Sequence, residues 1–177
     1  MTWAIIGAAA FLLFSTGLAA AGGISEGQTK YLYWTRWDAD FRAAAGRYGI
    51  DWRWIKATAI VESSLGQNPR VLAGGVSEDG KSWGLTQFTL GTANDMAPIT
   101  VTGVTYRGIG AAELNIPAVS IELAAKYLAQ LKARFPGDTR KAIISYNQGP
   151  GNTAKGNDFT GNYWEKWSSA MTLIKKG

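Results

Sequence analysis

The chain has 177 residues, 46% hydrophobic and 18% charged, which suits one domain with a real core and not a disordered chain. Its formal charge is +5, but the basic residues form no long run. Charge alone therefore selects no anionic partner, and we expect no nucleic-acid partner. The chain has no Cys and no His, which excludes Ser–His–Asp and Cys–His nucleophile systems, His-ligated zinc and disulfides.

Residues 1–22 predict a hydrophobic N-terminal helix that targets a membrane. The stretch from Trp3 to Ala21 is uncharged and, as a helix, would span roughly 28 Å, close to a bilayer core. It fits either a retained anchor, which we favour, or a cleaved signal peptide, which the small residues Ala19–Ala21 favour. The basic residues follow this stretch, and the positive-inside tendency would keep the domain in the cytoplasm. This conflicts with the targeting expected of such a segment, and the orientation stays open. Residues 23–30 predict a Gly-rich linker to a domain over residues 31–177.

The first half of that domain is predicted to be helical. A helix from Tyr31 to Tyr48 ends at Gly49. Asp51 is a candidate N-cap for a second helix over Trp52–Leu65, in which apolar residues recur at helical spacing. A loop follows over residues 67–81, and Thr89–Ala97 predicts a short helix.

The second half predicts one small β element followed by helices. Ile99–Tyr106 alternates β-branched residues around a glycine, as a hairpin would. Pro117 suits the first turn of a long amphipathic helix whose apolar residues recur every four positions. Asp138 is expected to cap the next helix, to about Asn147. Gly149–Gly151 predicts a turn and Gly161–Lys175 a last helix.

Glu62 is the strongest candidate for chemistry. It stands near the end of an apolar helix, where lost solvation raises the pKa of a carboxyl group. A carboxyl group that stays protonated near neutral pH can donate a proton to a leaving oxygen. An ordinary exposed glutamate on a polar helix face explains the same stretch.

Two further clusters carry polar side chains beside sharp turns. In Ser82–Phe88, a glycine permits close backbone approach, and Gln87 offers both a donor and an acceptor to a sugar amide. In Ala142–Gly151, a predicted helix delivers Tyr146 and Asn147 at its end. A tight turn, a core tyrosine and a helix-closing asparagine are the structural alternatives.

Together these clusters resemble the lytic transglycosylase family of the lysozyme-like superfamily. Glu62-Ser63 matches the family's Glu-Ser signature, and Gly84–Gln87 matches its Gly-Leu-Met-Gln block, with Thr86 where Met is usual. Ala142–Gly151 matches its Ala-x-x-x-Tyr-Asn-x-Gly-x-Gly block. Further matches lie at Asn115-Ile116 and Tyr127-Leu128, and the resemblance covers roughly Trp52 to Trp167. It implies a mainly α, lysozyme-like domain with a small β-hairpin.

The resemblance also implies a reaction that needs no metal or cofactor. Glu62 would cleave the β-1,4 bond between N-acetylmuramic acid and N-acetylglucosamine in peptidoglycan, as acid and then base, leaving 1,6-anhydromuramic ends. Tyr146 would hold Glu62 or the acetamido group, and Gln87 and Asn147 would bind sugar or order the groove. The residues expected to bind substrate are Ser63, Ser82, Thr86, Gln87, Tyr146 and Asn147.

Three alternatives remain. A lysozyme-type muramidase of the same fold would use Asp51, Glu78 or Asp79 to activate water. An inactive peptidoglycan-binding module and a structural membrane protein are the others. We expect glycan strands and, through the N-terminal segment, a membrane as partners, with the catalytic domain meeting the periplasmic wall. So short a chain suits an enzyme that works with a phage or a secretion apparatus. In the case of a phage, the protein would be a component of the virion.

Overall fold

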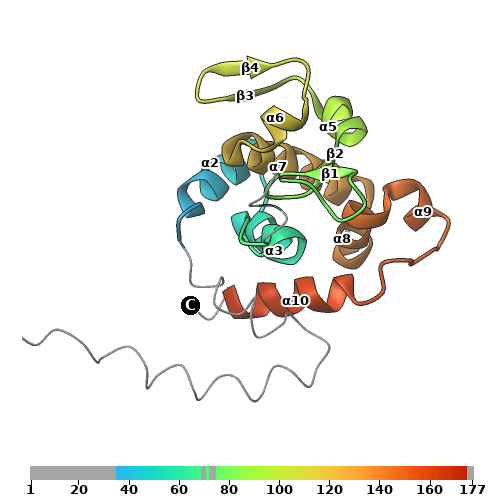
Figure 1. Cartoon of the computed structure of the whole chain (residues 1–177). Coiled ribbons are helices and arrows are strands. Elements are labelled where there is room, and N and C mark those ends of the chain that lie inside the picture. Colours follow the sequence, from blue (N-terminus) through green and yellow to red (C-terminus); the bar gives the residue numbers. More distant parts are fainter. Residues whose placement is uncertain (1–34, 69–70, 72–74, 175–177) are drawn as a thin grey trace, which may run out of the picture.

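In the computed structural model, the protein is described over residues 35–68, 71 and 75–174. The expected helix over residues 1–22 and the linker over 23–30 lie outside these residues. No helix among the described residues is long and apolar enough to cross a bilayer. Two two-stranded sheets accompany the helices (Figure 1). The elements are α2 (Asp38–Tyr48), α3 (Trp52–Ser63), β1 (Ser82–Trp83), β2 (Phe88–Thr89), α5 (Leu90–Met96), β3 (Ile99–Val101), β4 (Val104–Tyr106), α6 (Ala111–Leu114), α7 (Pro117–Arg134), α8 (Thr139–Gln148), α9 (Pro150–Ala154) and α10 (Tyr163–Ile174).

The helix α7 is the centre of the fold. Its apolar residues pack into the core, and it contacts α2, α3, α5, α6, α8 and β3. Glu122 of α7 is 1% exposed and forms an ion pair with Arg47 of α2, while the Tyr48 hydroxyl donates to it at 3.0 Å. Removing the Arg47 charge would leave the buried Glu122 carboxylate poorly compensated, so this pair fixes α2 on α7.

The cap residues place the helix starts where the sequence indicated. Asp51 accepts a hydrogen bond from the Arg53 N–H at the start of α3. Pro117 occupies the first turn of α7, and Asp138 accepts from the Lys141 N–H at the start of α8. These three predictions are confirmed because each depends on contacts within one helical turn.

Other predicted boundaries shift. The first described helix begins at Asp38, and the acidic Asp38 and Asp40 favour a helix N-terminus there. The helix was predicted to begin at Tyr31, but residues 31–34 lie outside the described residues. The turn predicted at Gly149–Gly151 is wrong: Pro150 begins the short helix α9, because a proline suits the first helical turn. The hairpin over Ile99–Tyr106 is confirmed as β3 and β4, whereas β1 and β2 were not predicted.

The helix α10 packs against α3 and carries side chains to it from the far end of the sequence (Figure 1). The Trp167 indole N–H donates to the Thr58 hydroxyl of α3 at 3.1 Å, and its ring meets Trp54 edge-on at 5.5 Å. Trp164 stacks on Trp167. These aromatic contacts hold α10 along α3.

Candidate active site

Glu62 lies in the last turn of α3 and is partly buried. The Tyr163 hydroxyl, from the start of α10, donates to Glu62 Oε1 at 2.6 Å. Burial raises the pKa of Glu62 to about 7, and the hydrogen bond from Tyr163 offsets part of that rise. Glu62 is therefore poised to give up and regain a proton near neutral pH.

Ser63 lies beside Glu62 in sequence but points into the protein. It is 1% exposed, and its hydroxyl donates to the Leu85 carbonyl at 2.5 Å and accepts from the Gly66 N–H at 2.8 Å. It does not line the cleft, although the sequence placed it among the substrate-binding residues. Ser63 instead joins the end of α3 to the segment Gly84–Gln87.

The segment Gly84–Gln87 passes close to α6 and α7. A Cβ atom on Gly84, where φ is 78°, would lie 2.0 Å from the Leu114 carbonyl oxygen, so only glycine fits. Thr86 is fully buried, with its backbone N–H and hydroxyl bonded to Ser120 of α7. Thr86, expected to contact substrate, therefore faces the core and not the cleft.

Gln87, the last residue of this segment, and Tyr146 of α8 both line the cleft. The Tyr146 hydroxyl donates to the Thr86 carbonyl at 2.9 Å, and not to Glu62 as the sequence allowed. Burial and the nearby Glu62 carboxylate raise the pKa of Tyr146 well above 10, so this hydroxyl stays protonated. The Gln87 amide donates to the Gly84 carbonyl at 2.8 Å, which closes the turn.

Glu62 opens into a cleft of about 320 Å³ between α3, the β1–β2 segment and the end of α8. Of the residues predicted to bind substrate, Ser82, Gln87, Tyr146 and Asn147 line it with Glu62. Glu62 is the only acid among the lining residues of the described chain. The remaining lining residues are Phe88, Thr89, Thr92, Tyr127, Gln148 and Gly149.

The other acids considered from sequence lie elsewhere. Asp51 caps the first turn of α3, about 16 Å along the helix from Glu62. Glu78 and Asp79 are exposed in a loop, where Asp79 accepts from the Ser77 hydroxyl at 2.6 Å. None of the three lines the cleft.

Sequence reasoning missed Tyr163 and two of the cleft aromatics. Tyr163 lies 101 positions after Glu62, and no spacing relates the two. Tyr127 belongs to the apolar residues that recur every four positions along the predicted long helix, yet it packs on Tyr146 at 5.4 Å and lines the cleft. A hydroxyl group within an otherwise apolar stripe was the available signal, since a hydroxyl at a core position needs a polar surrounding. Phe88 carried no comparable signal.

The transglycosylase SLT domain family model matches residues 40–166, which contain Glu62 and every cleft residue named above. The chain belongs to this family. The chain is 33% identical over 115 residues to peptidoglycan transglycosylase gp16 of Escherichia phage T7, and the match covers 65% of the chain and 8% of that protein. The chain thus spans less than a tenth of the length of this relative.

A solved structure supports the fold of the SLT domain. Lytic transglycosylase Slt from Pseudomonas aeruginosa, crystallised as an inactive mutant, superposes with a TM-score of 0.63 at 23% identity. The match covers 81% of this chain and 24% of that one. The expectation of a mainly helical, lysozyme-like domain with a small hairpin is therefore confirmed.

Proposed function

We propose that this SLT domain is a peptidoglycan lytic transglycosylase, which cleaves the bond between N-acetylmuramic acid and N-acetylglucosamine. The observation that carries the proposal is Glu62, whose carboxyl group lines the cleft with a pKa of about 7. A group with this pKa exists in both protonation states at neutral pH, as one residue must if it acts first as acid and then as base.

In the first step, protonated Glu62 donates its proton to the glycosidic oxygen. The bond to the muramic anomeric carbon breaks, and the N-acetylglucosamine fragment leaves with the proton as a hydroxyl group. The cationic centre that remains is stabilised by the substrate's own N-acetyl group. Tyr163 is a positioning residue here, because its hydrogen bond fixes the rotamer of the carboxyl group.

In the second step, ionised Glu62 removes the proton from the muramic C6 hydroxyl. That oxygen attacks the anomeric carbon of the same sugar and closes a 1,6-anhydro ring, so no water enters the product. The attacking group is tethered to the reacting ring, which gives it a high effective molarity. Glu62 regains its proton and is ready for another cycle.

The placement of the other acids supports ring closure over hydrolysis. An inverting or retaining hydrolase needs a second carboxyl group roughly 5–9.5 Å from the first. Asp51 lies at the opposite end of α3, and Asp79 is held by Ser77 in an exposed loop. Neither reaches the cleft that Glu62 lines.

Polar residues along the cleft would hold the glycan. Asn147 presents an amide and Ser82 a hydroxyl at the wall of the cleft. Gln87 also lines the cleft, and the bond from its side-chain nitrogen to the Gly84 carbonyl would orient its side-chain carbonyl as an acceptor. These groups match the hydroxyl and acetamido groups of N-acetylated sugars. Tyr146 would act at the back of the cleft, where its ring packs against Phe88.

Digestion of purified peptidoglycan in heavy-oxygen water tests the proposal. We expect 1,6-anhydromuramic ends without label for the wild-type chain, and no cleavage for Glu62→Gln. Asp79→Asn is the matched control and should cleave normally. Labelled reducing ends would identify a hydrolase, and wild-type binding without cleavage would identify an inactive module.

We further propose that the enzyme opens the wall locally for a phage or a secretion apparatus. The similarity to a phage peptidoglycan transglycosylase supports this role. Residues 1–22 would anchor it in a membrane and residues 23–30 would link the anchor to a domain over 31–177. A chain lacking residues 1–22 should be soluble and still cleave peptidoglycan, and a folded but inactive truncation would contradict these boundaries.

A further inference from the structure

The loop between α9 and α10 presents an aromatic ring to solvent. Phe159 is 71% exposed, the most exposed large hydrophobic residue in the described part of the chain, ahead of Val104 at 52%. A single exposed apolar residue is ordinary on a protein surface. What distinguishes Phe159 is the way in which its backbone is held.

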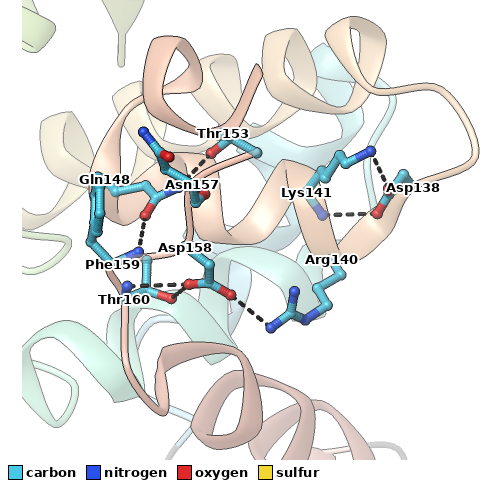
Figure 2. A network of polar contacts seen from close by, with 9 residues as sticks. All are labelled: Asp138, Arg140, Lys141, Gln148, Thr153, Asn157, Asp158, Phe159 and Thr160. Atoms are coloured by element: carbon cyan, nitrogen blue, oxygen red, sulfur yellow. Dashed lines mark hydrogen bonds and ion pairs between the residues drawn. The ribbon is translucent and has the colours of Figure 1, made fainter. Parts of the chain in front are cut away.

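The side chain of Gln148 holds the backbone on both sides of Asp158. Its Oε1 accepts a hydrogen bond from the Phe159 N–H at 2.6 Å, and its Nε2 donates to the Asn157 carbonyl at 2.6 Å and to the Thr153 hydroxyl at 3.0 Å. Gln148 is also the last residue of α8 and lines the cleft. Figure 2 shows Phe159 beside Gln148, at the side of the network away from Arg140.

Asp158 braces the same loop from its other side. Its carboxylate accepts from Arg140 Nη2 at 2.7 Å and from the Thr160 hydroxyl at 2.6 Å (Figure 2). These bonds order the backbone around Phe159 while its ring stays uncovered. A ring carried on an ordered loop loses less conformational entropy when a ligand covers it.

We propose that Phe159 is a stacking platform that extends the cleft along the glycan strand, with Gln148 as its positioning residue. A cleft of about 320 Å³ holds only part of a polymeric strand, so the strand must continue over the adjoining surface. The C–H face of a pyranose ring is apolar and fits an aromatic face. Gln148 lines the cleft, and its side chain bonds the loop backbone on both sides of Asp158, so the loop that carries Phe159 adjoins the cleft.

This inference rests on the proposed function, because it takes the glycan strand as the occupant of the cleft. Gln148 stands at the unspecified third position of the Tyr-Asn-x-Gly-x-Gly block, so the block itself assigns it no role. Phe159 itself lies beyond that block, in a loop that the motif does not specify.

The test measures binding of glycan oligomers to the full chain in the Glu62→Gln background, which separates binding from cleavage. The probes are oligomers of one, two and three N-acetylglucosamine–N-acetylmuramic acid repeats, and titration calorimetry measures the Kd of each. Phe159→Ala should bind the longest oligomer about tenfold more weakly and the shortest one unchanged. Phe159→Trp should restore binding. Val104→Ala, a matched truncation on the distant β3–β4 hairpin, should have no effect (Figure 1).

Gln148→Ala should show the same length-dependent loss, and the double variant with Phe159→Ala should lose little more. Additive losses would overturn the positioning role of Gln148. Equal binding of Phe159→Ala and its parent at every length, with the wild-type chain still cleaving peptidoglycan, would overturn the platform and leave the proposed function standing. A wild-type chain that neither binds nor cleaves glycan would overturn both.

Discussion

Replacing Glu62 with Gln should stabilise the protein at alkaline pH while it abolishes cleavage. Burial raises the pKa of Glu62 from 4.5 to about 7, so the folded protein binds this proton more tightly than the unfolded chain. This tighter proton binding stabilises the folded protein; the contribution is fully present below pH 4.5 and is lost as the pH rises through 7. Above pH 7, the wild-type protein carries a desolvated charge that glutamine lacks.

The size of the effect follows from the same two pKa values. Each factor of ten in proton affinity corresponds to about 1.4 kcal/mol, so a pKa raised from 4.5 to about 7 corresponds to about 3 kcal/mol at most. Glu62 keeps some contact with solvent, which lowers the expected gain to about 1–3 kcal/mol. In a domain of this size, that is a rise in melting temperature of about 3–10 °C.

Thermal unfolding of both full-length proteins at pH 4 and pH 8.5 measures this gain. The two should melt together at pH 4, because the amide can still accept the Tyr163 hydrogen bond as the protonated acid does. The variant should melt higher at pH 8.5. Asp79→Asn is the control and should show no such gain, because hydrogen bonds lower the pKa of Asp79. An equal difference at both pH values, or none at pH 8.5, would refute a desolvated Glu62.

Three further variants test the site. Tyr163→Phe removes a hydrogen bond that lowers the pKa of Glu62, so the alkaline limb of the pH–rate profile should move to higher pH; an unmoved limb would contradict the contact. Gly84→Ala should destabilise the protein by about 3 kcal/mol or prevent folding, as denaturant titration would measure, because its Cβ meets the Leu114 carbonyl. Asn147→Ala should lower kcat roughly 10²–10³-fold at an unchanged melting temperature, since Asn147 is exposed in the cleft; a large loss of stability would make it a scaffold residue.

The fold was predictable where local chemistry decides it. Asp51 and Asp138 cap helices through bonds within a few residues, and Pro117 suits a first turn wherever it stands. The strands Ser82–Trp83 and Phe88–Thr89 were not predictable, because two residues are too few to show an alternating pattern. They form because they pair with each other across a turn, and the alternation of polar and apolar residues along a single strand does not predict such pairing.

The candidate site was predictable where a side chain stands inside a recognisable block. Glu62, Gln87 and Asn147 line one cleft although they come from three separate segments. Tyr163 escaped prediction because its contact with Glu62 depends on how α10 packs across α3. That packing is decided by indole contacts such as that of Trp167 with Thr58, which lie in different parts of the sequence.

Hydrogen bonds to the backbone of Leu85 and Thr86 explain how the site is held together. Ser63 bonds the Leu85 carbonyl, Ser120 bonds the Thr86 N–H and Tyr146 bonds the Thr86 carbonyl, so three helices converge on one stretch of backbone. Thr86 stands where the resembled family has Met, and its buried hydroxyl lies 2.8 Å from the hydroxyl of Ser120. A thioether could not donate to the Ser120 carbonyl, so Thr86 and Ser120 form a matched pair in the core. The departure at position 86 therefore changes how the cleft is supported, and the cleft surface is formed by other residues.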